Sequence, residues 1–301
     1  MERDIILRAV VFPAIVIAVA CLGLGAFLRR IPGSRREAAM GALLPMAVSL
    51  ASFRALAVQQ GEQLLSGLAP GVSYGWLPTA LLVAAAVAGA IAVGASPLAV
   101  RIACIAAPAV AFGLLAPPGL RGGEAQVIAA AVASVAATVS VRSFRTSPRA
   151  GYAAWWLALS AVSAFPIVAG FAKLGFIAAS LAASMAALGV LSALRFGVSC
   201  GPAMHVTMAT ALGCVAFLGM GYDEAPLPRA CWIVAALAPM GSWAASLIPP
   251  AMPAIIRITA ISVAPAAIIA GSLAVAVAAG SSAEGGHDGY AGARPVTVGR
   301  P

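Results

Sequence analysis

The sequence predicts an all-α protein: a polytopic bundle of about ten helices (nine to ten) that cross a lipid bilayer. Three observations predict this fold class. Of the 301 residues, 62% are hydrophobic and 9% are charged, whereas soluble domains carry about 25% charged residues. The mean hydropathy is +1.02, so there are too few polar residues to cover a soluble core of this size. The apolar residues also gather in long continuous windows, which suits helices in hydrocarbon.

Each apolar window is close to the roughly 20 residues that an α-helix needs to cross about 30 Å of hydrocarbon. A membrane β-barrel would instead alternate apolar and polar residues with a period of two. We therefore expect residues 1–280 to form one helical bundle. The windows cover residues 10–28, 38–58, 76–93, 98–115, 125–141, 152–171, 174–194, 203–219, 230–247 and 254–278.

The basic residues are distributed unevenly between the two sets of loops. Loops after the odd-numbered windows contain or adjoin ten basic residues and one acid, whereas the other side holds eight of each. Because cytoplasmic loops are enriched in basic residues, the first set should be cytoplasmic and both termini non-cytoplasmic. We expect a multi-pass protein of a bacterial cytoplasmic (inner) membrane. The ten basic residues are Arg29, Arg30, Arg35, Arg36, Arg101, Arg142, Arg145, Arg149, Arg195 and Arg257.

The windows divide evenly around the basic loop at 142–149. Residues 1–141 and 152–280 would be two halves of five spans each, and halves with an odd number of spans enter a membrane in opposite senses. Pro13 matches Pro166 and Pro108 matches Pro239 between the halves, but other prolines have no counterpart. Chance and duplication explain these matches equally well. The glycine-rich polar segment 281–301 should be a disordered tail.

Ionisable groups inside apolar windows are the most informative candidates for a site, because burying a charge in hydrocarbon costs several kcal/mol unless it meets water or a partner. No Asp or Glu lies near the centre of a window, which argues against a proton relay built on carboxylates. Arg54 and Arg101 lie one to two turns inside their windows and could face a cavity for an anionic group. The alternative is that their long side chains reach back to the lipid headgroups.

His205 follows the most unusual local stretch of the chain, SCGPAM at 199–204. Gly201 and Pro202 interrupt helical hydrogen bonding and could open the backbone toward a site. The alternative is an interfacial histidine in the first turn of a helix, where proline is well tolerated. Together, Arg54, Arg101 and His205 are the candidate cavity residues.

The sequence offers little support for catalysis or cofactor binding. One histidine without further ligands does not make a metal site, and no phosphate-binding GxxxxGK[ST] segment is present. GMGYD at 219–223 lacks the second membrane aspartate that an aspartyl protease needs. We therefore predict no catalytic residues, no metal and no cofactor. The tryptophans near window ends, including Trp155 and Trp232, are interpreted as an interfacial belt.

Ten spans in about 300 residues, arranged as five plus five, resemble the architecture of the drug/metabolite transporter superfamily. The segment LPMAVSLASFRALA at 44–57 is similar to the proline-then-arginine pattern in the second helix of that group's repeat. The second half has no matching arginine segment. The charge count also puts the N-terminus outside, whereas that family keeps it inside. We take this as a likeness of size and span number.

The leading functional hypothesis is a transporter or permease-like bundle for a small or amphipathic molecule. Its cavity would lie near the midplane, between spans that carry Pro45, Arg54, Arg101, Pro108 and His205. The alternative is a non-catalytic scaffold or accessory subunit that binds a membrane protein partner through its loops. The lipid bilayer is the expected surrounding in both cases. The basic residues are explained by membrane topology, so no nucleic acid partner is expected.

Overall fold

The computed structural model describes residues 7–28, 33–60, 73–92, 96–115, 123–145, 148–194, 196, 200–222, 227–249 and 252–284. Over these residues the chain is all-helical, without strands. The elements are η1 (Leu7–Val11), α2 (Phe12–Phe27), α3 (Gly33–Gln60), η4 (Ser73–Trp76), α4 (Leu77–Ala92), α5 (Pro97–Gly113), α6 (Gly123–Ser143), α7 (Pro148–Val168), α8 (Ala172–Ala193), α9 (Pro202–Gly221), α10 (Arg229–Leu237), α11 (Pro239–Ser246) and α12 (Ala254–Glu284).

Within the described residues, six helical segments are long and apolar enough to cross a membrane. Three shorter apolar helices accompany them, at Phe12–Phe27, Ala38–Leu50 and Pro97–Gly113. The prediction of an all-α fold is therefore confirmed, whereas the count of about ten spans stays a prediction. The six segments are Tyr74–Ile91, Gly123–Ser143, Ala150–Val168, Ala172–Ala193, Pro202–Gly221 and Ala254–Ala278.

Proline sets several helix boundaries. Pro97, Pro148, Pro202 and Pro239 are the first residues of α5, α7, α9 and α11, where the missing amide proton costs nothing and the fixed φ suits a helix. The helix start at Pro239 divides the ninth apolar window into two short helices, α10 and α11. The intervening Ala238 keeps helical backbone angles, so the break is a kink between the two helices.

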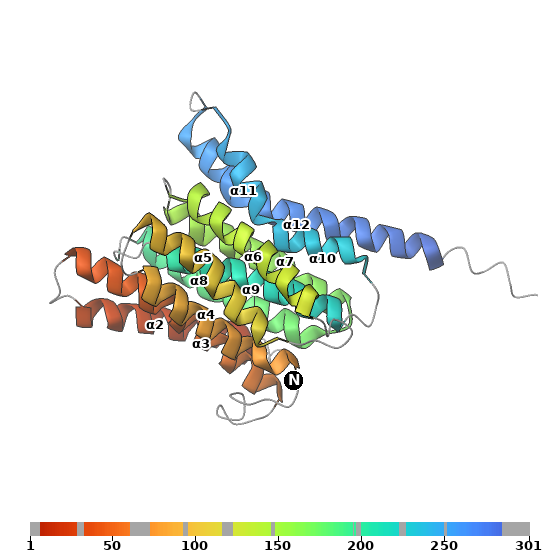
Figure 1. Cartoon of the computed structure of the whole chain (residues 1–301), viewed down its shortest axis with the longest axis horizontal. Coiled ribbons are helices and arrows are strands. Elements are labelled where there is room, and N and C mark those ends of the chain that lie inside the picture. Colours follow the sequence, from red (N-terminus) through yellow and green to blue (C-terminus); the bar gives the residue numbers. More distant parts are fainter. Residues whose placement is uncertain are drawn as a thin grey trace, which may run out of the picture.

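Helix α9 lies in the middle of the bundle (Figure 1). It packs against α4, α5, α6 and α10, and every residue from Ala203 to Gly219 is buried. Its threonine side chains bond to their own helix: Thr207 and Thr210 donate to the carbonyl oxygens of Ala203 and Val206. Such local bonds satisfy buried hydroxyls without a partner from another helix. The centre of the bundle is therefore closely packed.

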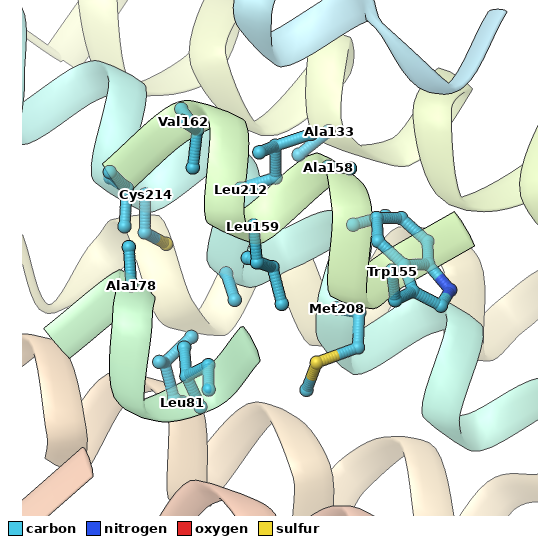
Figure 2. Close-up of a cluster of buried hydrophobic side chains, with 14 of the residues drawn as sticks. Leu81, Ala133, Trp155, Ala158, Leu159, Val162, Ala178, Met208, Leu212 and Cys214 are labelled. Atoms are coloured by element: carbon cyan, nitrogen blue, oxygen red, sulfur yellow. The ribbon is translucent and has the colours of Figure 1, made fainter. Parts of the chain in front are cut away.

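The main hydrophobic core surrounds α9 on the sides of α7, α8 and α4. Figure 2 shows Trp155 and Leu159 of α7 beside Met208 and Leu212 of α9, with Leu81 of α4 below them. All five side chains are buried. Small residues such as alanine are frequent in this core, which lets neighbouring helices approach closely.

The two sequence halves are interleaved in space. From the second half, α8 packs against α2 and α3, and α9 packs against α4, α5 and α6. Helix α12 lies at the edge of the bundle on α7, α10 and α11 (Figure 1). The internal repeat stays a prediction. Helix α12 continues to Glu284, past the expected start of the tail at Ser281, and residues 285–301 lie outside the described residues.

A candidate anion-binding cavity

A cavity of about 420 Å³ lies at the end of the bundle where α5 and α9 begin and where α6 ends. Its position follows from the packing of α5, α6 and α9 against one another. The cavity is at a helix end, whereas the sequence predicted one near the middle of the spans. It is lined by Pro97, Val100, Arg101, Cys104, Thr138, Val141, Arg142, Phe144, Arg145, Cys200, Gly201, Pro202 and His205.

Three arginines give this cavity its charge. Arg101 lies on the second turn of α5, Arg142 on the last turn of α6, and Arg145 just after that helix. All three are exposed, and no Asp or Glu is among the described residues that line the cavity. Burial raises the pKa of the Cys200 thiol, so this thiol stays neutral and adds no compensating negative charge. The lining is therefore cationic.

His205 forms part of the cavity wall in a fixed orientation. Its side chain is 2% exposed, and its Nδ1 accepts a 2.9 Å hydrogen bond from the indole Nε1 of Trp155. The ring of Phe144 stacks on the imidazole at 5.0 Å with an interplanar angle of 2°. Because Nδ1 is an acceptor, we assign the proton of the neutral imidazole to Nε2.

The Nε2 atom of His205 is buried and makes no hydrogen bond of ordinary geometry, although the backbone of Cys200 is close enough to interact with the ring. Helix α7 comes very close here: a Cβ atom added to Gly151 would lie 2.6 Å from Cε1 of His205 and 3.2 Å from Sγ of Cys200. Only glycine leaves room for this contact. The imidazole is thus held in place by Trp155, Phe144 and Gly151.

Two helix N-termini meet at the cavity. Ser96 caps α5 with an extended backbone, and its side-chain oxygen accepts a 3.1 Å hydrogen bond from the amide of Ala99. Gly201 occupies the same position in α9 but has no side chain to cap the helix. Helix N-termini carry a partial positive charge. They therefore add to the positive potential that the arginines create.

An aromatic cluster, which we define as Tyr74, Phe171 and Tyr222, lies at the opposite end of the bundle. Their ring centroids lie 5.1 to 5.6 Å apart. Gly170 has a φ of 81°, a backbone conformation that favours glycine, and this turn between α7 and α8 places Phe171. The Nζ atom of Lys173 lies 5.7 Å from the centroid of the Tyr74 ring.

The structure brings two of the three predicted site residues together. Arg101 and His205 line the same cavity, although they are far apart in sequence. Arg54 belongs to α3, but its side chain lies outside the described part of the structure. His205 lies in the first turn of α9, which begins at Pro202, and its side chain is buried and accepts a hydrogen bond at Nδ1.

Sequence reasoning missed three residues at this site. Arg142 and Arg145 were assigned to a cytoplasmic loop by charge counting alone, and only the packing of α6 against α5 and α9 reveals that they share a cavity with Arg101. Trp155 was assigned to the interfacial belt, but it is 2% exposed and holds His205. Trp232 is also fully buried. For these two tryptophans the belt interpretation is wrong.

The arrangement suits binding of an anion better than covalent chemistry. Among the described residues, no group of three His, Cys, Asp or Glu side chains could hold a metal ion. Guanidinium groups bind phosphate and carboxylate through paired, charge-assisted hydrogen bonds. A comparison of the chain with protein-family models, curated proteins and solved structures finds no match.

Proposed function

We propose that this chain is a multi-pass protein of the bacterial inner membrane that moves a small molecule across the bilayer, with the cationic cavity as its binding site. The single observation that carries this proposal is the lining of that cavity. Arg101, a charge inside an apolar window, shares a cavity with His205 and two further arginines. Intramembrane charges that face a cavity mark substrate pathways in many membrane proteins.

The two ends of the bundle differ in a way that supports a carrier. One end has a cavity, and at the other end the rings of Tyr74, Phe171 and Tyr222 pack against one another. Carriers work by opening a site to one side of the membrane at a time. This asymmetry corresponds to a state that is open to the arginine-rich side, which charge counting assigns to the cytoplasm.

The scaffold alternative has one observation in its favour. The central helix α9 is buried from Ala203 to Gly219, and the hydroxyls of Thr207 and Thr210 are satisfied by their own helix. Transport would require this packing to rearrange. A scaffold would keep it unchanged and use the arginines to bind lipid headgroups or a membrane protein partner.

Transport can be tested with the purified full-length chain in proteoliposomes. We would measure the currents that inorganic phosphate, phenyl phosphate and succinate evoke on a solid-supported membrane. The proposal expects a current with at least one of these anions, and its loss in Arg101→Ala at equal protein density. Arg229→Ala, an exposed arginine at the start of α10, is the matched control and should keep the current. Absence of current with all three anions favours the scaffold, whereas an equal current in Arg101→Ala shows transport that does not use this cavity.

A further inference from the structure

The positive charge of the cavity has no counterpart among the described side chains that line it. Arg101, Arg142 and Arg145 lie around a single cavity of about 420 Å³, and none of the lining residues that the structure describes is acidic. Like charges that are held together repel, and the repulsion is stronger where water is partly excluded. A bound anion would remove this repulsion and form charge-assisted hydrogen bonds with the guanidinium groups.

The three arginines differ in how the nearest helix end affects their charge. Arg142 lies in the last turn of α6, where a cation is favoured by the helix dipole without any ligand. Arg145 follows the same helix end. Arg101 instead lies near the N-terminal, positive end of α5, so the helix offers its charge no compensation. Arg101 is therefore the arginine whose position argues most strongly for an anionic ligand.

The walls of the cavity indicate that the ligand also has an apolar part. Val100, Val141 and Phe144 supply aliphatic and aromatic surface between the arginines, and Pro97 and Pro202 complete it. Cavities of roughly 300 to 1,000 Å³ are typical of sites for small organic molecules. An inorganic ion would leave most of this volume unfilled.

His205 gives the cavity a rigid wall on the side of α9. Its side chain is 2% exposed, and its buried Nε2 lies against Gly151 of α7 and near the backbone of Cys200. The bond from Trp155 and the stacking of Phe144 hold the ring in place, as expected for a pre-formed binding site.

We infer that the cavity binds an amphipathic organic anion. Its phosphate or carboxylate head lies among Arg101, Arg142 and Arg145, and its apolar part lies against Val100 and Phe144. The anion is either a water-soluble phosphate ester or carboxylate, or the headgroup of an anionic phospholipid, because both present the same chemistry to the arginines. The claim that this anion is transported rests on the proposed function. The claim that the cavity binds it does not.

Binding is tested on the delipidated full-length protein in a neutral detergent, by thermal shift and tryptophan fluorescence. The probes are phenyl phosphate, inorganic phosphate, uncharged phenol, and detergent-solubilised phosphatidylglycerol with phosphatidylcholine as its neutral counterpart. Phenyl phosphate should bind saturably and at least roughly tenfold more tightly than inorganic phosphate, because its ring is removed from water. Arg101→Ala should weaken binding by roughly tenfold to a hundredfold.

Arg145→Ala serves as a second variant. Arg145 follows the end of α6, so removal of its side chain should not disturb folding. Arg229→Ala is the matched control, and its affinity should equal that of the wild type. Saturable binding of phenyl phosphate supports a soluble ligand, and binding of phosphatidylglycerol alone supports a lipid headgroup. The inference is overturned if phenol or phosphatidylcholine binds as tightly as the anions, if no anion binds, or if Arg101→Ala and Arg145→Ala both bind like the wild type.

The outcomes for this inference and for transport are separable. Anion binding without any transport current leaves the inference standing and removes the proposed function. Transport of a molecule without anion binding at the cavity removes the inference and leaves transport as the function. Both measurements use the same purified chain, so differences in folding between preparations do not confuse them.

Discussion

The indole Nε1 of Trp155 donates a 2.9 Å hydrogen bond to Nδ1 of His205. Trp155 is the eighth residue of α7 and His205 the fourth of α9, so the bond joins the N-terminal halves of these helices, and both side chains are buried. It fixes Nδ1 as an acceptor and orients an imidazole that lines the cationic cavity. The site and the packing of two central helices therefore depend on the same pair of side chains.

Trp155→Phe should destabilise the protein by about 1–3 kcal/mol, because Nδ1 of a buried imidazole then loses its hydrogen-bond donor. The change is measured as the free energy of unfolding in mixed micelles. The double variant Trp155→Phe, His205→Phe should recover part of this loss, since it removes the unsatisfied nitrogen. Equal stability of Trp155→Phe and the wild type contradicts the hydrogen bond.

Gly219→Ala should be strongly destabilising. A Cβ atom at Gly219 would approach Cζ3 and Cη2 of Trp232 to 2.2 and 2.3 Å, and the Trp232 ring is fully buried. Overpacking of this kind costs about 1–3 kcal/mol or more. Gly271→Ala in α12 is the matched control, because a Cβ there meets nothing within 4 Å. It should be neutral or slightly stabilising, and similar losses of stability in both variants contradict the tight contact between α9 and Trp232.

The double variant Phe171→Ala, Tyr222→Ala should open the end of the bundle opposite the cavity. It removes all the ring contacts within the aromatic cluster. Cys214 of α9 is fully buried, and its reaction with a membrane-impermeant thiol reagent added to the non-cytoplasmic side should become faster. Phe27→Ala, which removes an exposed ring of α2, should leave the rate unchanged. Unaltered reactivity of Cys214 in the double variant indicates that other residues close this end.

The orientation of the chain is tested with a reporter that is active only in the cytoplasm. A fusion after Arg145 should be active, and a fusion at the C-terminus should be silent, because the arginine-rich loops should face the cytoplasm. Fusions of equal expression level are compared. The opposite pattern means that one span was miscounted in the sequence.

The helices could be predicted from the sequence because a long apolar segment in lipid must satisfy its own backbone hydrogen bonds, and an α-helix does so within one segment. Each window coincides with a helix of the structure, apart from the ninth, which Pro239 divides. The exact break could not be predicted, since proline is tolerated inside α5 at Pro108 and inside α7 at Pro166. Whether a proline kinks or starts a helix depends on the neighbours that satisfy the freed carbonyl.

The candidate site could be predicted only in part. Arg101 and His205 were recognised one at a time, because each is an unusual residue beside or inside an apolar window. Their common cavity depends on the contact of α5 with α9, which no periodicity in the sequence encodes. Trp155 was misassigned for the same reason: a tryptophan near a window end looks identical in sequence whether it faces lipid or another helix.

The central claim is that the cavity at the arginine-rich end is an anion site open to the cytoplasm. It is tested most directly by Val100→Cys, a cavity-lining position, in a variant whose five native cysteines are replaced by alanine. We expect a membrane-impermeant thiol reagent to modify this cysteine in inside-out vesicles only, and phenyl phosphate to slow the reaction. Modification in right-side-out vesicles, or a rate in inside-out vesicles that phenyl phosphate does not change, would contradict the account.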